Sequence, residues 1–173
     1  AINHLTRSPV AGAPRNVLVE SARIARGNIT DIAQVSADQI DGLIFPGGFG
    51  AAKNLCNFAD KGADCTVNPE VDRLVGEMLK AGKPIGAICI APAMLARVVG
   101  RHGVHPRMTI GNDKATAAAM EQMGTRHVDC PCESFVVDEA NKIVTTPAYM
   151  LGKGPAMVFE GIRRLVDEVI RLG

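Results

Sequence analysis

The stretch 84–95 constrains the fold more than any other part of the chain, because it predicts a buried strand that turns directly into a helix at Cys89. Pro84 lacks an N–H and therefore suits the first position of a strand. Residues 85–88 are small or apolar enough to be covered on both faces of a sheet. After the joint, apolar residues repeat at helical spacing at Leu95, Val98 and Val99.

A cysteine at such a joint lies beside the free N–H groups of a helix start. The partial positive charge of these groups favours thiolate over thiol. They can also hold an oxyanion, as in a nucleophile elbow. The alternative is that Cys89 is a small buried hydrophobe, which is the commoner role of a free cysteine. From this stretch alone both interpretations stay open.

Composition excludes several classes of function. The 173 residues carry a formal net charge of +1 with well-mixed signs, which argues against nucleic acid or an acidic partner as the main ligand. Aromatic residues make up only 3%, too few for base-stacking platforms. Five scattered cysteines favour free thiols in a reducing compartment over a disulfide framework. No apolar run approaches the roughly 20 residues of a membrane span.

Strand and helix patterns alternate along the chain, which predicts an α/β fold with a largely parallel sheet and helices on both faces. The opening residues predict a loop, with a weak edge strand around Ile29 and Ile32. Residues 36–39 have the spacing of a capping box, and 51–64 read as a mostly irregular excursion. The expected strands are 42–45, 85–88, 108–110, 127–128, 135–137 and 142–146. The expected helices are 16–25, 69–81, 91–99, 115–123 and 158–169.

Ligands of such sheets bind outside the carboxyl ends of the strands. Four segments of this chain are expected there: the glycine turn 46–50, Cys89, 111–113 and 147–149. The glycine turn lacks the spacing of a phosphate loop or of a dinucleotide fingerprint. It is either a plain tight turn or a wall whose N–H groups face Cys89. The convergence of four segments favours Cys89 as a nucleophile.

Other candidate chemistry is weaker. Cys130 and Cys132 lack the further Cys or His pair of a structural zinc site, so they are interpreted as reduced, partly buried thiols, and no metal site is predicted. No histidine is placed by its position in the sequence to serve Cys89. A Cys–His pair is the usual route to activation.

Three segments resemble the ElbB family of glyoxalase-like proteins, within the PfpI and class I glutamine amidotransferase-like superfamily. They are 45–55 (FPGGFGAAKNL), 89–92 (CIAP) and 145–150 (TTPAYM). The early segment from Asn16 to Gly27 is also similar to that family. The resemblance covers essentially the whole chain, so residues 1–173 are expected to be a single domain of this superfamily.

The resemblance implies a flavodoxin-like three-layer sandwich with a mostly parallel sheet. Family members carry a further N-terminal strand, its helix and an acidic residue that hydrogen-bonds the cysteine, which this chain is expected to lack. Many superfamily members also have a histidine where this chain has Gly111-Asn112-Asp113, so a Cys–His–acid triad is not supported. Relatives are bacterial cytoplasmic proteins or mitochondrial and plastid proteins, and superfamily members commonly dimerise. A homodimer, or a subunit of an assembly, is therefore expected.

The resemblance implies glyoxalase or deglycase-type activity, and we expect a cofactor-independent enzyme in which the Cys89 thiolate adds to glyoxal or a related small dicarbonyl and yields a 2-hydroxy acid. The Gly48 and Ile90 N–H groups would stabilise the oxyanion. The expected substrate pocket comprises Gly47, Phe49, Lys53, Asn54, Asn112, Pro147 and Tyr149. The rival hypothesis is a catalytically weak or inactive amidotransferase-like subunit with a scaffold or redox-sensing role. Amidotransfer is the least favoured reaction, because the usual Cys–His–Glu set is absent from this sequence.

Overall fold

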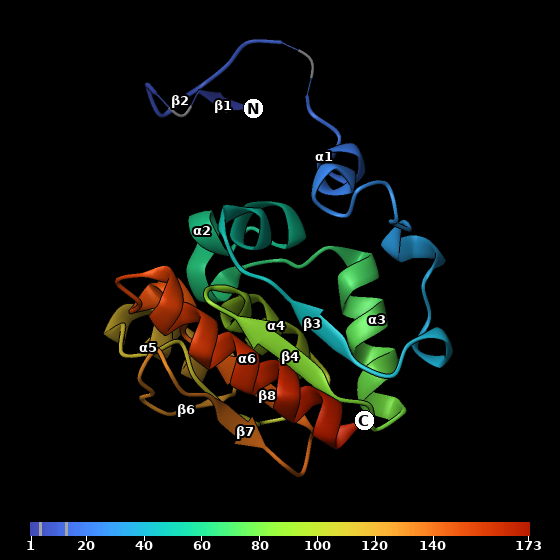
Figure 1. Cartoon of the computed structure of the whole chain (residues 1–173), viewed down its shortest axis with the longest axis vertical. Coiled ribbons are helices and arrows are strands. Elements are labelled where there is room, and N and C mark those ends of the chain that lie inside the picture. The colour runs from blue at the N-terminus through green and yellow to red at the C-terminus, as the bar shows by residue number, and fades with distance from the viewer. Residues whose placement is uncertain (4, 13) are drawn as a thin grey trace. The chain divides into compact units, whose positions relative to one another are not determined.

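The structure is a computed structural model that describes every residue except 4 and 13, and it divides into two compact units, residues 1–35 and 36–173 (Figure 1). The first unit holds a short antiparallel hairpin of β1 (Ile2–Asn3) and β2 (Ser8–Pro9), followed by helix α1 (Val17–Ile24).

Two expectations for this unit are wrong in detail. The opening forms a hairpin instead of a plain loop, because the Asn3 Oδ1 accepts the Leu5 N–H at 2.9 Å and stabilises the turn. The segment around Ile32 is a 3-10 turn (Ile32–Gln34) instead of an edge strand. The Asp31 carboxylate accepts the Ala33 N–H at 3.0 Å and starts that turn.

The second unit is built on a four-stranded sheet in the order β3-β4-β8-β7. Its strands are β3 (Leu43–Phe45), β4 (Ile85–Ile88), β8 (Ile143–Thr146) and β7 (Val136–Asp138). The first three are parallel, with Phe45 opposite Ala87 and Ala87 opposite Thr145, whereas β7 runs antiparallel to β8. A separate parallel pair consists of β5 (Arg107–Met108) and β6 (Arg126–His127).

Helices cover both faces of the sheet, which confirms the predicted three-layer α/β sandwich. Helix α6 (Pro155–Leu172) lies on one face, where a side chain at Gly86 would meet Leu165 and Val169 at 3.0–3.1 Å. Helix α4 (Ala91–Arg101) lies against β4 on the other face and packs on α3 (Pro69–Lys80) and α5 (Lys114–Gln122). The sheet therefore sits between two helical layers (Figure 1).

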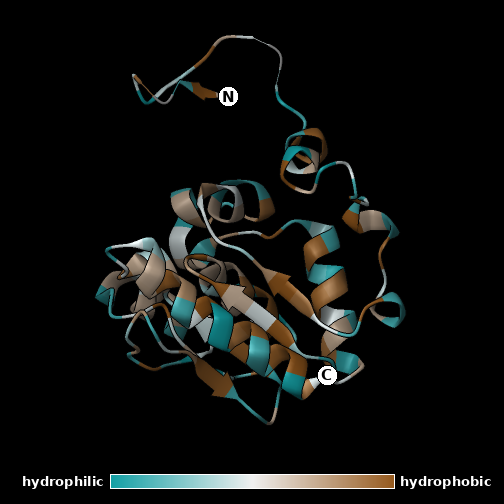
Figure 2. Ribbon diagram, in the orientation of Figure 1, coloured by the Kyte–Doolittle hydropathy of each residue, from teal (hydrophilic) through white to brown (hydrophobic). Residues whose placement is uncertain are grey.

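The core explains why these segments fold as they do. All four residues of β4 and of β8 are buried, as expected for strands covered on both sides. Helix α6 is amphipathic: Val158, Leu165 and Val169 are buried against the sheet, while its charged residues face outward (Figure 2).

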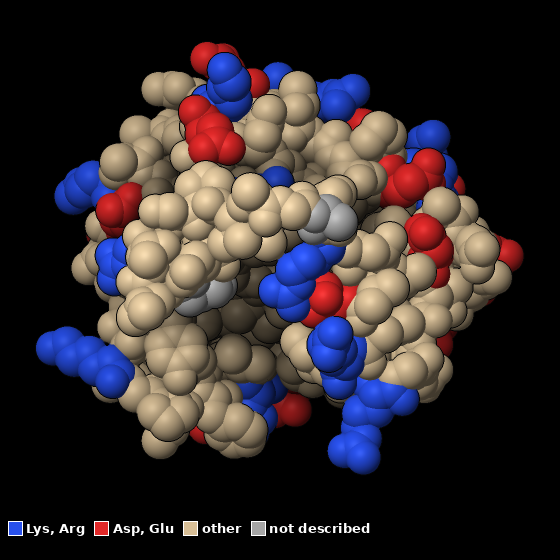
Figure 3. All heavy atoms as spheres, turned by 90° about the horizontal axis from the view of Figure 1, so that it is seen from above, with Lys and Arg blue, Asp and Glu red and all other residues tan. Residues whose placement is uncertain are grey.

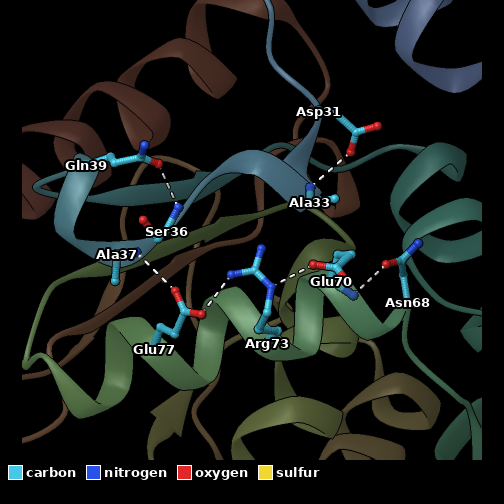
Figure 4. A network of polar contacts seen from close by, with 9 residues as sticks. All are labelled: Asp31, Ala33, Ser36, Ala37, Gln39, Asn68, Glu70, Arg73 and Glu77. Atoms are coloured by element: carbon cyan, nitrogen blue, oxygen red, sulfur yellow. Dashed lines mark hydrogen bonds and ion pairs between the residues drawn. The ribbon is translucent and has the colours of Figure 1, made fainter.

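The entry to β3 is held by polar contacts (Figure 4). The capping box predicted at Ser36 is present, with the Gln39 side chain accepting the Ser36 N–H at 2.8 Å. The Ala37 N–H donates to the Glu77 carboxylate at 3.1 Å, and Arg73 donates to the same carboxylate at 2.8 Å. The chain ahead of β3 is thereby fixed to α3.

The excursion at 51–64 is more helical than expected. It comprises a π-helix (Ala51–Leu55), the short helix α2 (Phe58–Lys61) and a 3-10 turn (Gly62–Asp64). The part that holds α2 and the 3-10 turn is closed by an antiparallel bridge between Cys56 and Val67 and by a 2.7 Å hydrogen bond from the Thr66 N–H to the Asn57 side chain. These ties are non-local, so residue patterns did not reveal them.

Candidate functional site

The site is centred on Cys89, at the joint between β4 and α4 that the sequence predicted. Its backbone has φ = 62°, a conformation that non-glycine residues rarely adopt. The Cys89 N–H donates to the Thr146 carbonyl at 3.0 Å, which ties the turn to the end of β8. With Ile90 as the N-cap of α4, the thiol lies at the start of a helix.

The glycine turn after β3 packs directly on this joint. A Cβ at Gly47 would lie 2.5 Å from the Cys89 Cβ and 2.7 Å from the Ile88 carbonyl oxygen, so only glycine allows this approach. Gly48 has φ = 85°, but a Cβ added there would meet no atom within 4 Å. In the described part of the chain, neither the Gly48 N–H nor the Ile90 N–H has a hydrogen-bond acceptor.

A cavity of about 390 Å³ opens beside the Cys89 thiol. It is lined by Gly48, Phe49, Ala52, Phe58, Ala59, Cys89, Ile90 and Met150. Gly48, Phe49 and Ile90 belong to the predicted site, and Gly47 supports it from behind Cys89.

Four lining residues were missed: Ala52, Phe58, Ala59 and Met150. The first three lie in the excursion at 51–64, whose short helices form one wall of the cavity. Ala52 and Met150 lie within the family-like segments 45–55 and 145–150, whereas the signal for Phe58 and Ala59 was the length of the excursion, since long loops are often functional.

The other predicted pocket residues lie around the cavity or away from it. The Lys53 Nζ is 5.8 Å from the centre of the Phe49 ring, and the Tyr149 side chain is exposed. Asn54 lies near Gly50, and Pro147 packs close to Gly111. None of these four residues lines the Cys89 cavity.

Asn112 lies in a second cavity of about 520 Å³, which it shares with Cys130 and Cys132 among others. Its predicted role towards the Cys89 thiol stays a prediction.

Burial separates Cys89 from the other four cysteines. Desolvation raises the pKa of each of those thiols above its usual value and so disfavours their thiolates. They are Cys56, Cys65, Cys130 and Cys132, all buried, whereas Cys89 is partly exposed. Cys89 is therefore the accessible thiol of the chain.

The described histidines are each engaged away from the Cys89 cavity. The His102 Nε2 lies 3.4 Å from an Asp72 carboxylate oxygen. The His105 Nδ1 is hydrogen-bonded to the Gly124 carbonyl at 2.8 Å, and the His127 Nε2 accepts the Ile110 N–H at 3.2 Å. None of the three lines the cavity.

Charge on the surface is mixed, with basic and acidic side chains scattered among uncharged ones on the face in Figure 3. Within residues 1–3, 5–12 and 14–173, no group of three or more His, Cys, Asp or Glu side chains is placed to hold a metal ion. Over the same residues, every helix is too short or too polar to cross a membrane.

Known proteins resemble the chain over nearly all of its length. Glutamine amidotransferase-like class 1 domain-containing protein 3, mitochondrial, from Homo sapiens is 46% identical, and the ES1 protein homolog, mitochondrial, from Rattus norvegicus is 44% identical. Each match covers 99% of this chain and 66% of the relative, so the chain spans just under two thirds of their length.

Among solved structures, an isoprenoid biosynthesis protein with an amidotransferase-like domain from Ehrlichia chaffeensis superposes with a TM-score of 0.89 at 37% identity. That match covers 99% of this chain and 77% of the other. The model of the DJ-1/PfpI family matches residues 19–162. The chain therefore belongs to the DJ-1/PfpI family, within the class I glutamine amidotransferase-like superfamily.

Proposed function

We propose that this chain is a cofactor-independent, glyoxalase-like enzyme of the ElbB type, which uses Cys89 to convert small dicarbonyls to 2-hydroxy acids. The observation that carries the proposal is the position of the Cys89 thiol. It is held at a strained turn, at the start of α4, and faces a cavity large enough for a small organic molecule.

The reaction begins when the Cys89 thiol adds across an aldehyde of glyoxal. An S–C bond forms, the carbonyl π bond breaks to leave a C–O single bond, and the thiol proton ends on that oxygen, which gives a hemithioacetal. A proton then moves from this carbon to the neighbouring one through an enediol, and the hydroxyl proton passes to the neighbouring oxygen, which leaves a thioester. Water attacks the thioester, releases glycolate and restores the thiol. The net change is addition of one water, with one carbon oxidised and its neighbour reduced.

The Gly48 and Ile90 N–H groups are the proposed donors to the oxyanion. Both residues line the cavity with Cys89, and both N–H groups lack an acceptor among the described residues. Donors of this kind stabilise charge as it develops on the substrate oxygen, and removal of one typically costs 10²- to 10³-fold in rate.

The proton transfer between the two carbons is the weak point of the site. Of the residues that line the cavity, Cys89 is the one with an ionisable side chain. Solvent water must therefore carry this proton, and we expect modest turnover. The same observation favours a second candidate, in which Cys89 is a redox-sensing thiol of a scaffold subunit.

The names of the relatives bear on location. Both mammalian relatives are described as mitochondrial, so we propose a mitochondrial location if the chain is eukaryotic. A homodimer or a larger assembly remains our proposal for its quaternary state.

The test is the conversion of glyoxal to glycolate by the chain, by Cys89→Ser and by Cys130→Ser as the matched control. Glycolate is quantified, because lysine and arginine side chains also consume glyoxal. We expect glycolate from the wild type and the control and none from Cys89→Ser. Glycolate formation by Cys89→Ser would refute the proposal. A folded wild type that forms none would leave the redox role, with peroxide oxidation of Cys89 as its readout.

A further inference from the structure

The walls of the Cys89 cavity are almost entirely apolar. Apart from the thiol, the side chains that reach it come from two phenylalanines, a methionine, an isoleucine and two alanines. The aromatic walls are Phe49 and Phe58, and Met150 supplies a flexible thioether. Contact with apolar groups stabilises such a surface, whereas an anion finds no partner on it.

The cavity is also larger than glyoxal needs. Its volume of about 390 Å³ lies at the lower end of the range typical of ligand sites, roughly 300–1,000 Å³. A water molecule occupies about 30 Å³ in the liquid, and glyoxal, with its two carbonyl groups, is about the bulk of two or three waters. Bound glyoxal would therefore leave most of the apolar wall in contact with water.

A charged substrate would fare worse. None of the residues that line the cavity carries a charge to pair with a carboxylate or a phosphate. A charge taken into an apolar site without a partner pays a large desolvation cost. The Lys53 ammonium lies 5.8 Å from the centre of the Phe49 ring, and Lys53 is not among the residues that line the cavity.

We propose that the Cys89 cavity binds the apolar substituent of its substrate, so that the preferred substrates are 2-oxoaldehydes with an aryl or branched alkyl group instead of glyoxal. The inference rests on the proposed function for its chemistry. For a substrate R–CO–CHO, the thiol adds to the aldehyde carbon, the proton on that carbon moves to the ketone carbon, and the hydroxyl proton passes to the ketone oxygen. Water then releases R–CH(OH)–COOH, which has the atoms of the substrate plus one water.

The first experiment compares phenylglyoxal with glyoxal as substrates of the whole chain. Mandelate and glycolate are quantified, and each kcat/KM is divided by the rate at which 2-mercaptoethanol adds to the same aldehyde. This division removes the intrinsic reactivity of the carbonyl. We expect the normalised kcat/KM for phenylglyoxal to exceed that for glyoxal at least tenfold, which corresponds to about 1.4 kcal/mol.

A pair of variants locates the preference. Phe49 is 79% exposed, so Phe49→Ala removes an aromatic wall with little loss of core packing. Phe159→Ala is the matched control, because Phe159 is 64% exposed on α6 and does not line the cavity. We expect Phe49→Ala to reduce the preference at least threefold and Phe159→Ala to leave it unchanged. An equal effect of both variants would overturn the assignment to this cavity.

A second experiment does not depend on turnover. Cys89 is alkylated with iodoacetamide and with N-phenyl iodoacetamide, and each rate is divided by that of 2-mercaptoethanol. Recognition of the phenyl group predicts at least a tenfold preference for the aryl reagent, reduced by Phe49→Ala.

The two experiments separate the proposals. An aryl preference in alkylation without turnover of either aldehyde supports the apolar site and refutes the glyoxalase. Turnover of both aldehydes with equal or higher normalised values for glyoxal supports the glyoxalase and overturns this inference. Absence of an aryl preference in both experiments overturns it as well.

Discussion

Gly47→Ala is expected to damage both the fold and the reactive turn. The new Cβ would lie 2.5 Å from the Cys89 Cβ and 2.7 Å from the Ile88 carbonyl oxygen, where 3.4–4 Å is ordinary contact. The overlap is close to 1 Å and involves backbone that β4 and β8 hold in place. Overpacking costs about 1–3 kcal/mol, occasionally more, and we expect a loss near the upper end, about 3 kcal/mol.

Gly48→Ala is the matched comparison. Its Cβ would meet nothing within 4 Å, but the backbone stands at φ = 85°. Holding a non-glycine residue in left-handed backbone costs about 1–2 kcal/mol. For a domain of this size, 1 kcal/mol lowers Tm by about 2–4 °C. We therefore expect a decrease of about 2–8 °C for Gly48→Ala and a decrease of at least about 6 °C for Gly47→Ala.

The assay combines thermal unfolding, which gives Tm, with the rate at which iodoacetamide alkylates Cys89 in the folded protein, followed by peptide mass spectrometry. Gly47→Ala should change the alkylation rate, since it displaces the thiol, whereas Gly48→Ala should alter it far less. The reasoning is refuted if the two variants are equally stable and Gly47→Ala alkylates at the wild-type rate.

The remaining predictions concern thiols, charge and capping. Cys89 should be alkylated at least tenfold faster at neutral pH than the four buried thiols, because desolvation raises the pKa values of those thiols. Peptide mapping after a short pulse of reagent measures the five rates, and equal rates would contradict this prediction. Hydrogen bonds from Arg163 and Arg164 lower the pKa of Glu160 from 4.5 to about 2, so its stabilising contribution is full above pH 4.5 and is lost as pH falls from there to about 2. Glu160→Gln should therefore have a lower free energy of unfolding in urea than the wild type at pH 7, and the two values should converge near pH 2. The difference at pH 7 should shrink in high salt. The Asn68 side chain caps α3 by accepting the Glu70 N–H at 2.9 Å. Asn68→Ala should therefore lower the free energy of unfolding by about 1 kcal/mol, and an unchanged urea midpoint would show that the cap contributes nothing.

The sequence predicted the framework of the site more completely than its walls. The strand from Ile85 and the helix after Cys89 follow from local patterns, because burial on both faces and helical spacing are visible residue by residue. The cavity wall around Phe58 was missed, because its short helices depend on the tie between Cys56 and Val67. Asn112 follows a predicted strand, yet it lines a different cavity. Placement at the carboxyl end of a strand does not determine which cavity a side chain enters.

Backbone strain gives an independent reason to regard this end of the sheet as functional. Cys89 has φ = 62° and Ala148, just past β8, has φ = 46°. A residue held in such a region costs about 1–3 kcal/mol and persists only where the surrounding structure enforces it. Both are so enforced: the Cys89 N–H donates to the Thr146 carbonyl at 3.0 Å, and the Ala148 carbonyl accepts the Gly152 N–H at 2.9 Å. Arg26 and Lys142 also stand at positive φ in turns, whereas the strain at Cys89 stands beside a cavity, and this combination supports our proposal that its thiol reacts there.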